Sequence, residues 1–152
     1  MLLWITKFTG GCEVMKNTKS DGELKVIDVP DGCGNAPRRV ILRDFVVALY
    51  SGDFESVSEW LREDTVWDFL DDARLADIEE IRAALAATPL PRELQIHTII
   101  THGRDASVDG NITFTDGSRT GFSHVIQFAG ATKTAKIKAI RTYQVTLDAG
   151  EN

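Results

Sequence analysis

Helical periodicity is the first pattern along the chain. Apolar side chains recur every three or four residues from Ile41 to Leu49, which is the spacing of one buried helix face. Asn35 can cap this helix, Pro37 suits its first turn, and Ser51-Gly52 ends it. The opposite, charged face carries Arg38, Arg39, Arg43 and Asp44. Asp53 can then cap a second helix that bears Phe54, Val57, Trp60 and Leu61.

After the second predicted helix, the spacing of the apolar residues is no longer helical. The stretch from Thr65 to Leu70 is β-branched and aromatic and predicts a strand. Asp77 and Glu80 have the spacing of a capping box, so we expect a short third helix with Ile78, Ile81 and Leu85 on its apolar side. The sequence Thr88-Pro89-Leu90-Pro91 breaks it.

Everything after Arg92 predicts β-structure, and a short strand is also expected over 23–29. Two Asp-Gly pairs in this part of the chain, at 109–110 and 116–117, could each form a hairpin turn. A turn at Asp116-Gly117 leaves flanking strands of about ten residues, so we place the hairpin there and a bulge at Asp109-Gly110. Residues 118–128 and 134–147 supply two more long strands.

This order of elements predicts an α+β fold, in which about three N-terminal helices cover one face of a curved antiparallel sheet. A curved sheet and a helical lid leave space between them, so a pocket is expected. The element order, the stretch Asp64-Thr65-Val66-Trp67, the helix over 78–87 and the closing strands resemble the nuclear transport factor 2-like superfamily. SnoaL-like polyketide cyclases, ketosteroid isomerases and limonene epoxide hydrolases belong to it.

The resemblance covers about residues 36–147 and implies a cone-shaped barrel, a hydrophobic cavity and a homodimer. One departure is that relatives commonly place a Gly just before the third helix, where this chain has Ala76-Asp77. We expect residues 1–22 to be a flexible N-terminal extension and 23–152 to form a single domain of this type.

Composition and residue spacing exclude several classes of partner and cofactor. The formal net charge of -6 disfavours nucleic acid and membrane surfaces, because phosphate binding needs clustered Lys and Arg. Cys12 and Cys33 show no C-x-x-C spacing, which favours a reducing compartment, the cytoplasm. The three His lack metal-ligand spacing, and no phosphate loop or dinucleotide fingerprint is present, so we expect neither a metal ion nor a cofactor.

Polar residues on apolar strand faces are the candidate site residues. Alternation places His124 on the apolar face of 118–128, and it places Arg141 and Tyr143 on the face of 135–147 that we take as apolar. Burying such groups without partners is costly, so we expect them to meet in the pocket.

Asp68 is the nearest plausible carboxylate, but alternation lets only one of Trp67 and Asp68 point inward, and we favour Trp67. The predicted pocket lining is Trp67, Phe122, Tyr50 and Thr98.

Two functions stay open. In the first, the protein binds an apolar, carbonyl-containing small molecule and acts on it as an isomerase, cyclase or hydrolase. His124 or Asp68 would then serve as acid–base group, and Arg141 or Tyr143 would stabilise an oxyanion. In the second, the chain is a non-catalytic ligand-binding or dimerisation module, His124 is a satisfied core histidine and Arg141 belongs to a structural ion pair.

Overall fold

The structure is a computed structural model that describes residues 4–5, 16–17, 23–28, 37–70 and 72–148. The predicted cap Asn35, both cysteines and most of the predicted extension 1–22 lie outside the described residues. Within residues 1–22, Trp4–Ile5 (β1) and Lys16–Asn17 (β2) pair antiparallel.

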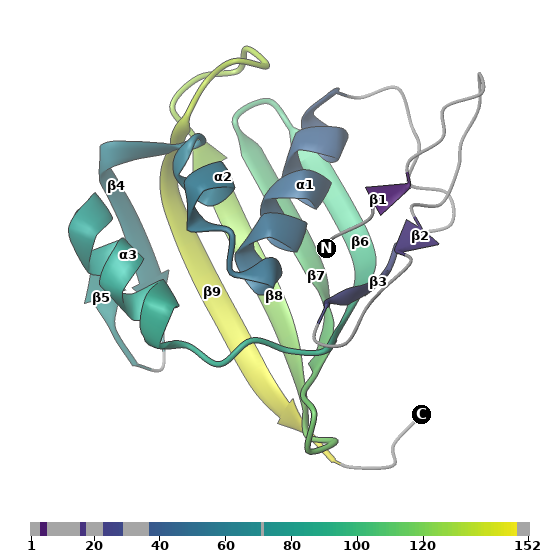
Figure 1. Cartoon of the computed structure of the whole chain (residues 1–152). Coiled ribbons are helices and arrows are strands. Elements are labelled where there is room, and N and C mark those ends of the chain that lie inside the picture. Colours follow the sequence, from purple (N-terminus) through teal and green to yellow (C-terminus); the bar gives the residue numbers. More distant parts are fainter. Residues whose placement is uncertain (1–3, 6–15, 18–22, 29–36, 71, 149–152) are drawn as a thin grey trace.

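Seven strands of the described chain form one curved, open sheet in the order β3-β6-β7-β8-β9-β4-β5. Figure 1 shows the helices on one side of it. The helices are α1 (Pro37–Ser51), α2 (Phe54–Ser58) and α3 (Ile78–Ala87). The strands of the sheet are β3 (Lys25–Ile27), β4 (Leu61–Phe69), β5 (Arg74–Leu75), β6 (Glu93–His102), β7 (Asp105–Thr113), β8 (Arg119–Phe128) and β9 (Ile137–Leu147).

The predicted α+β class is confirmed, but the sheet is mixed. The run from β6 to β9 is antiparallel, as expected from its hairpins. At its two ends, β3 pairs parallel with β6 and β4 pairs parallel with β9. Both parallel partners come from before the hairpin run in sequence. Within the described residues, no helix combines the length and the apolar character that crossing a membrane requires.

The first two helices begin and end near their predicted signals. Leu42, Phe45 and Val46 of α1 are buried, and Gly52 ends the helix with a φ of 78°. The Asp53 carboxylate accepts a hydrogen bond from the Ser56 N–H at 3.1 Å and caps α2. However, α2 is shorter than predicted, because Leu61 already pairs with Ile137 in the sheet.

The hairpin between β7 and β8 turns at Asp116-Gly117, as predicted. Gly117 has a φ of 88°, and the Asp116 carboxylate accepts the Ser118 N–H at 2.9 Å. The other Asp-Gly pair faces a bulge whose extra residue, His97, lies in the neighbouring strand β6. A Cβ at Gly110 would lie 2.0 Å from the Gln95 carbonyl oxygen, so only glycine fits opposite this bulge.

The bulge at His97 reverses the alternation of β6. Leu94 and Ile96 are buried before it, but Ile99 is buried after it, while Ile100 is 58% exposed. Thr98 therefore lies exposed on the outer face of the sheet. Its prediction as a pocket-lining residue is wrong, because strict alternation does not survive the extra residue.

A second register shift does the same to β9. Gln127 pairs with Ala139 and Phe128 with Ile137, which leaves Lys138 as the extra residue. After it the even-numbered residues turn inward, so Ile140 and Thr142 are buried. Arg141 and Tyr143 lie on the exposed face instead, and their predicted inward orientation is wrong for this reason.

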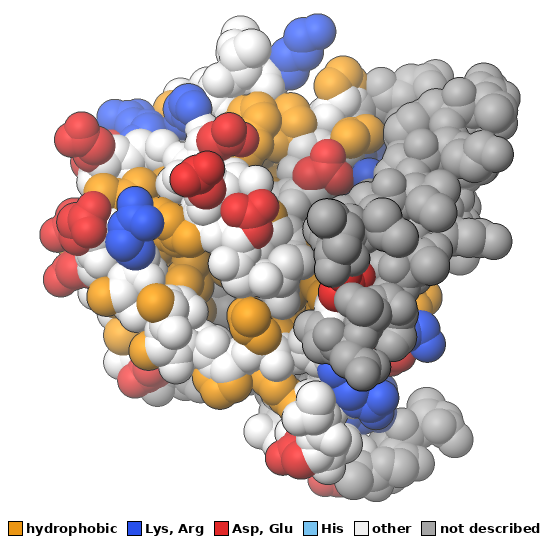
Figure 2. All heavy atoms as spheres, viewed as in Figure 1, with side chains coloured by type: hydrophobic (Ala, Val, Ile, Leu, Met, Phe, Trp, Pro, Cys, Tyr) orange, Lys and Arg blue, Asp and Glu red, His pale blue; other side chains and the backbone are white. Residues whose placement is uncertain are grey.

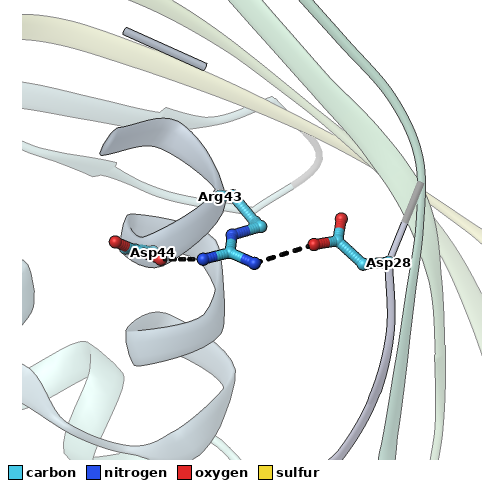
Figure 3. A network of polar contacts seen from close by, with 3 residues as sticks. All are labelled: Asp28, Arg43 and Asp44. Atoms are coloured by element: carbon cyan, nitrogen blue, oxygen red, sulfur yellow. Dashed lines mark hydrogen bonds and ion pairs between the residues drawn. The ribbon is translucent and has the colours of Figure 1, made fainter. Parts of the chain in front are cut away.

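The segment that follows β3 contacts the charged face of α1 through one ion pair. Figure 3 shows Arg43 of α1 between Asp44 and Asp28, with 3.0 Å from its guanidinium to each carboxylate. Asp28 follows β3, whose Lys25 N–H donates to the Arg92 carbonyl oxygen at 2.9 Å. The segment 23–28 is thus held both by the sheet edge and by α1.

Arg38, in the first turn of α1, is also buried rather than exposed. It donates hydrogen bonds to the carbonyl oxygens of Gly103 and Thr132, and its guanidinium lies 3.9 Å from the centroid of the Phe128 ring. This single side chain joins the start of the helix to two loops of the sheet.

Candidate functional site

A cavity of about 50 Å³ lies between the end of α1, the sheet and the segment that leads from α3 to β6. One water molecule needs about 10–15 Å³ on this scale, so the space suits several waters or a small organic molecule. Its wall is mostly apolar. The lining residues are Leu49 and Tyr50 from α1, Trp67 and Phe69 from β4, Leu85 from α3, Thr88, Pro89 and Leu90 from the connecting segment, His124 from β8 and Gln144 from β9.

The two sides of the cavity differ in exposure. Trp67, His124 and Tyr50 are 0%, 2% and 8% exposed, so the wall they form is closed. Thr88, Pro89 and Leu90 line the cavity and are at the same time exposed to solvent. Access to the cavity therefore lies on the side of this connecting segment, which crosses below the helices in Figure 1.

Figure 2, in the same view, shows hydrophobic side chains exposed between the helices, and acidic side chains gathered over α2 and α3. Glu55 of α2 and Glu79 and Glu80 of α3 belong to this acidic surface. Arg82 of α3 lies 3.6 Å from Glu79, so this surface carries charges of both signs.

A chain of four hydrogen-bonded side chains contains the three residues of the closed wall together with Thr142, which does not itself line the cavity. The Trp67 indole N–H donates to Thr142 Oγ1 at 2.8 Å. His124 Nδ1 lies 2.8 Å from the same oxygen, and His124 Nε2 lies 3.0 Å from the Tyr50 hydroxyl oxygen. The side chains come from β4, β9, β8 and α1, so the network joins the sheet to the helix layer.

Burial keeps both titratable members of this chain uncharged. It lowers the pKa of His124 from 6.5 to about 3, because the imidazolium would lose its hydration. It also raises the pKa of Tyr50 far above its ordinary value of 10.0, for the corresponding reason. At neutral pH the wall therefore presents a neutral imidazole and a protonated phenol.

Only part of the predicted site comes together. His124, Trp67 and Tyr50 line the cavity. Phe122 does not, but its ring centroid lies 5.1 Å from that of Tyr50 and 5.0 Å from that of His124, so it packs against both rings. The preference for Trp67 over Asp68 as the inward residue of β4 is confirmed by the complete burial of Trp67.

The remaining candidates lie elsewhere. Asp68 is on the outer face of β4, where its carboxylate lies 3.5 Å from the Arg74 guanidinium. Arg141 and Tyr143 lie on the outer face of β9, and Thr98 on that of β6. None of these four belongs to the lining of the cavity.

Sequence reasoning missed Thr142, Gln144 and the segment 88–90. The strict alternation that placed Arg141 and Tyr143 inward also placed Thr142 and Gln144 on the outer face, because the register shift at Lys138 was not recognised. A signal was present, since the face taken as apolar contained both Arg141 and Tyr143, while Ile140 stood on the polar one. The segment 88–90 was read only as a helix break.

This arrangement can hold a neutral molecule and offer it hydrogen bonds, but it has no strong base. The lining residues include no Asp or Glu, and His124 has both ring nitrogens within hydrogen-bond distance of protein groups. Among the described residues, no group of three or more His, Cys, Asp or Glu is arranged to hold a metal ion.

Comparison with known proteins identifies the fold. No protein-family model matches the sequence, and no curated protein matches it significantly. Among solved structures, an NTF2-like protein of unknown function from Burkholderia xenovorans LB400 is similar, with a TM-score of 0.64 and 16% identity over 76% of this chain and 88% of that one.

Two further neighbours carry functional names. A candidate ketosteroid isomerase from Kribbella flavida has a TM-score of 0.59 and 16% identity, over 76% of this chain and 82% of that one. A candidate SnoaL-like polyketide cyclase from Shewanella denitrificans OS-217 has a TM-score of 0.59 and 12% identity, over 71% of this chain and 90% of that one. The chain has the fold of the nuclear transport factor 2-like proteins, as its sequence pattern predicted.

Proposed function

We propose that the protein binds a small, neutral, mostly apolar molecule that carries a carbonyl group in the cavity between α1 and the sheet. The observation that carries the proposal is the Tyr50–His124 pair, two neutral polar groups at the closed end of an otherwise largely apolar wall. A few polar groups set in an apolar lining are typical of small-molecule sites. One of the neighbours with this fold is named for a ketosteroid, which is a carbonyl compound.

A pair of matched probes tests this proposal. Cyclopentanone and methylenecyclopentane have nearly the same shape, but only the ketone can accept a hydrogen bond. We expect NMR titration with cyclopentanone to shift signals around Tyr50, Trp67 and His124, and methylenecyclopentane to bind more weakly. The Tyr50→Phe variant should bind the ketone about tenfold more weakly, which corresponds to one hydrogen bond of about 1.4 kcal/mol.

Tyr143→Phe is the matched control, because Tyr143 is the other tyrosine of the chain and lies outside the cavity wall. It should bind cyclopentanone as the wild type does. Equal weakening in both variants, or shifts confined to other parts of the molecule, would show that the cavity is not the site.

Catalysis is a second candidate function, favoured by the same pair. A hydrogen-bond donor in a site shielded from water stabilises negative charge on a carbonyl oxygen, as in isomerase and cyclase chemistry. Since the cavity lining holds no carboxylate, proton removal from carbon would need water or a group of the ligand itself. We therefore place binding first and acid–base catalysis second.

Exchange of the α-protons of cyclopentanone in heavy water separates the two functions. A catalyst should accelerate this exchange above the buffer rate, and Tyr50→Phe should lose the acceleration while Tyr143→Phe keeps it. Binding without faster exchange identifies a non-catalytic binding protein.

We also propose that the molecule is a homodimer whose copies meet through the outer face of the sheet. Tyr143 and Val145 of β9 are 44% and 64% exposed on that face, and Ile100 of β6 is 58% exposed. Apolar side chains exposed on the outer face of the sheet favour contact with the same face of a second copy of the chain. We propose the cytoplasm as the compartment, because two cysteines without paired spacing suit a reducing environment.

Light scattering tests the dimer. The expected mass is twice 16.8 kDa, and Val145→Lys should lower it toward that of the single chain. Val40→Lys is the matched control, since Val40 is 44% exposed on α1. A wild-type mass of 16.8 kDa, or equal effects of the two variants, would contradict the proposed interface.

A further inference from the structure

The hydrogen bonds that run from Trp67 through Thr142 and His124 to Tyr50 have a direction that follows from the chemistry of Trp67. The Trp67 indole nitrogen can only donate, so Thr142 Oγ1 must accept there. The Thr142 hydroxyl has a single proton. Within the described part of the chain, the acceptor in reach of that proton is His124 Nδ1, at 2.8 Å.

The positions of the protons on His124 and Tyr50, which we call the proton order, then follow. If His124 Nδ1 accepts, the ring carries its proton on Nε2 and donates it to the Tyr50 oxygen. The Tyr50 hydroxyl proton is then not used within the network and can be donated to a molecule in the cavity, which Tyr50 lines.

The opposite order is less favourable. A proton on Nδ1 would point at Thr142 Oγ1 and leave the Thr142 proton without an acceptor, at a residue that is 1% exposed. A buried donor without a partner is costly, whereas a donor that faces the cavity can reach water or a ligand.

We propose that Trp67 and Thr142 are positioning residues that fix this proton order, so that Tyr50 presents a hydrogen-bond donor and the cavity selects small neutral molecules that accept a hydrogen bond. The ligand preference rests on the proposed function. The proton order does not, because it follows from the protein's own contacts.

The proton order is measured on the ligand-free protein. Long-range ¹H–¹⁵N correlation spectra of the histidine rings, with His124 assigned by the His124→Phe variant, report which ring nitrogen carries the proton. The expected result is a protonated Nε2 and a hydrogen-bonded, unprotonated Nδ1. A protonated Nδ1 in the wild-type protein overturns the proposal, because the result is taken from the wild type and His124→Phe serves only to assign its signals.

Variants at Thr142 test its positioning role. Thr142→Val keeps the shape but removes the hydroxyl, so the Nδ1 signal should move to that of a nitrogen without a hydrogen bond. Thr142→Ser restores a hydroxyl and should restore the signal. If the Nδ1 signal is the same in Thr142→Val and wild type, Thr142 does not act on His124.

The ligand preference is measured with two five-membered rings. Cyclopentanone only accepts hydrogen bonds, whereas pyrrole offers an N–H donor and no comparable acceptor. We expect cyclopentanone to bind at least about fivefold more tightly, and Tyr50→Phe to remove the difference. Equal or tighter binding of pyrrole overturns the selection of acceptors. If neither ring enters the cavity while Nε2 is protonated, the proposed function and its ligand preference fail, but the proton order holds.

Discussion

His124 shows how much a single buried side chain constrains its surroundings. Its ring is 2% exposed, and each ring nitrogen lies within hydrogen-bond distance of a neighbouring side chain. A neutral imidazole satisfies both contacts with one donor and one acceptor, whereas an imidazolium would have two donors and a charge to bury. The folded structure therefore excludes the proton that this residue readily binds when it is exposed.

The first prediction is a loss of stability in mild acid. The pKa of His124 is about 3 in the folded protein, below its ordinary value of 6.5, so the unfolded chain binds more protons between these values. The stability due to the neutral ring is complete above pH 6.5 and decreases as the pH falls toward 3. When the pH falls from 7.5 to 5.0, the titration of His124 is expected to lower the free energy of unfolding by about 2 kcal/mol. Urea denaturation at both pH values measures this difference.

The control is His124→Phe, which removes this titration but keeps His97 and His102. Its loss of stability between the same two pH values should be smaller than that of the wild type by about 2 kcal/mol. Parallel losses in the two proteins would mean that His124 is not held neutral by the fold.

At the level of elements, strand alternation predicts the faces correctly only where the strand is regular. In β8 the inward residues Phe122, His124, Ile126 and Phe128 follow the predicted alternation without interruption. In β6 and β9 one extra residue, His97 or Lys138, reverses it. A bulge is set by the pairing of two strands, so the sequence of one strand alone shows only its consequences.

The second prediction concerns the glycine opposite the first bulge. Gly110→Ala should cost about 3 kcal/mol or more, because the new Cβ would lie 2.0 Å from the Gln95 carbonyl oxygen and the backbone must move. Gly121→Ala in the neighbouring strand is the matched control, since its nearest contact would be an ordinary 3.5 Å. Thermal or urea unfolding should show a change within about 1 kcal/mol for the control. Similar costs for both would argue against the close approach of β6.

The third prediction concerns the attachment of β3. Asp28 and Asp44 both contact Arg43, but their side chains are 10% and 57% exposed. Asp28→Asn should therefore cost about 1–2 kcal/mol, and Asp44→Asn about 0.5 kcal/mol or less. Hydrogen exchange should become faster at the Lys25 amide, which bonds to Arg92, in the first variant only. Equal exchange in both variants would show that the ion pair does not hold the strand.

At the scale of the whole molecule, the sequence predicted the fold better than the site. The helix caps, the Asp116-Gly117 hairpin and the long strands are local signals, and each was recognisable from neighbouring residues. The cavity wall is instead assembled from α1, α3, β4, β8, β9 and the segment 88–90. His124 and Trp67 were found because their strands are regular at those positions, whereas Thr142 lies beyond a register shift and was missed.

The entrance of the cavity provides the last prediction. Gly52 and Gly103 have positive φ values of 78° and 61°, so alanine at either position should cost about 1 kcal/mol. They differ in their surroundings. A Cβ at Gly52 would lie 2.9 Å from Leu90 Cδ1, whereas no atom lies within 4 Å of one at Gly103. Gly52→Ala should therefore displace Leu90, which lines the cavity on its exposed side.

Methyl NMR of Leu90 and the dissociation rate of cyclopentanone measure this displacement. Gly52→Ala should shift the Leu90 methyl signals and release the ketone faster, because the side chain that narrows the entrance has moved. Gly103→Ala should lose similar stability without either change, so it separates backbone strain from the opening of the cavity. If both variants leave the rate of the wild type unchanged, the ligand does not pass Leu90, and the entrance lies elsewhere in the wall.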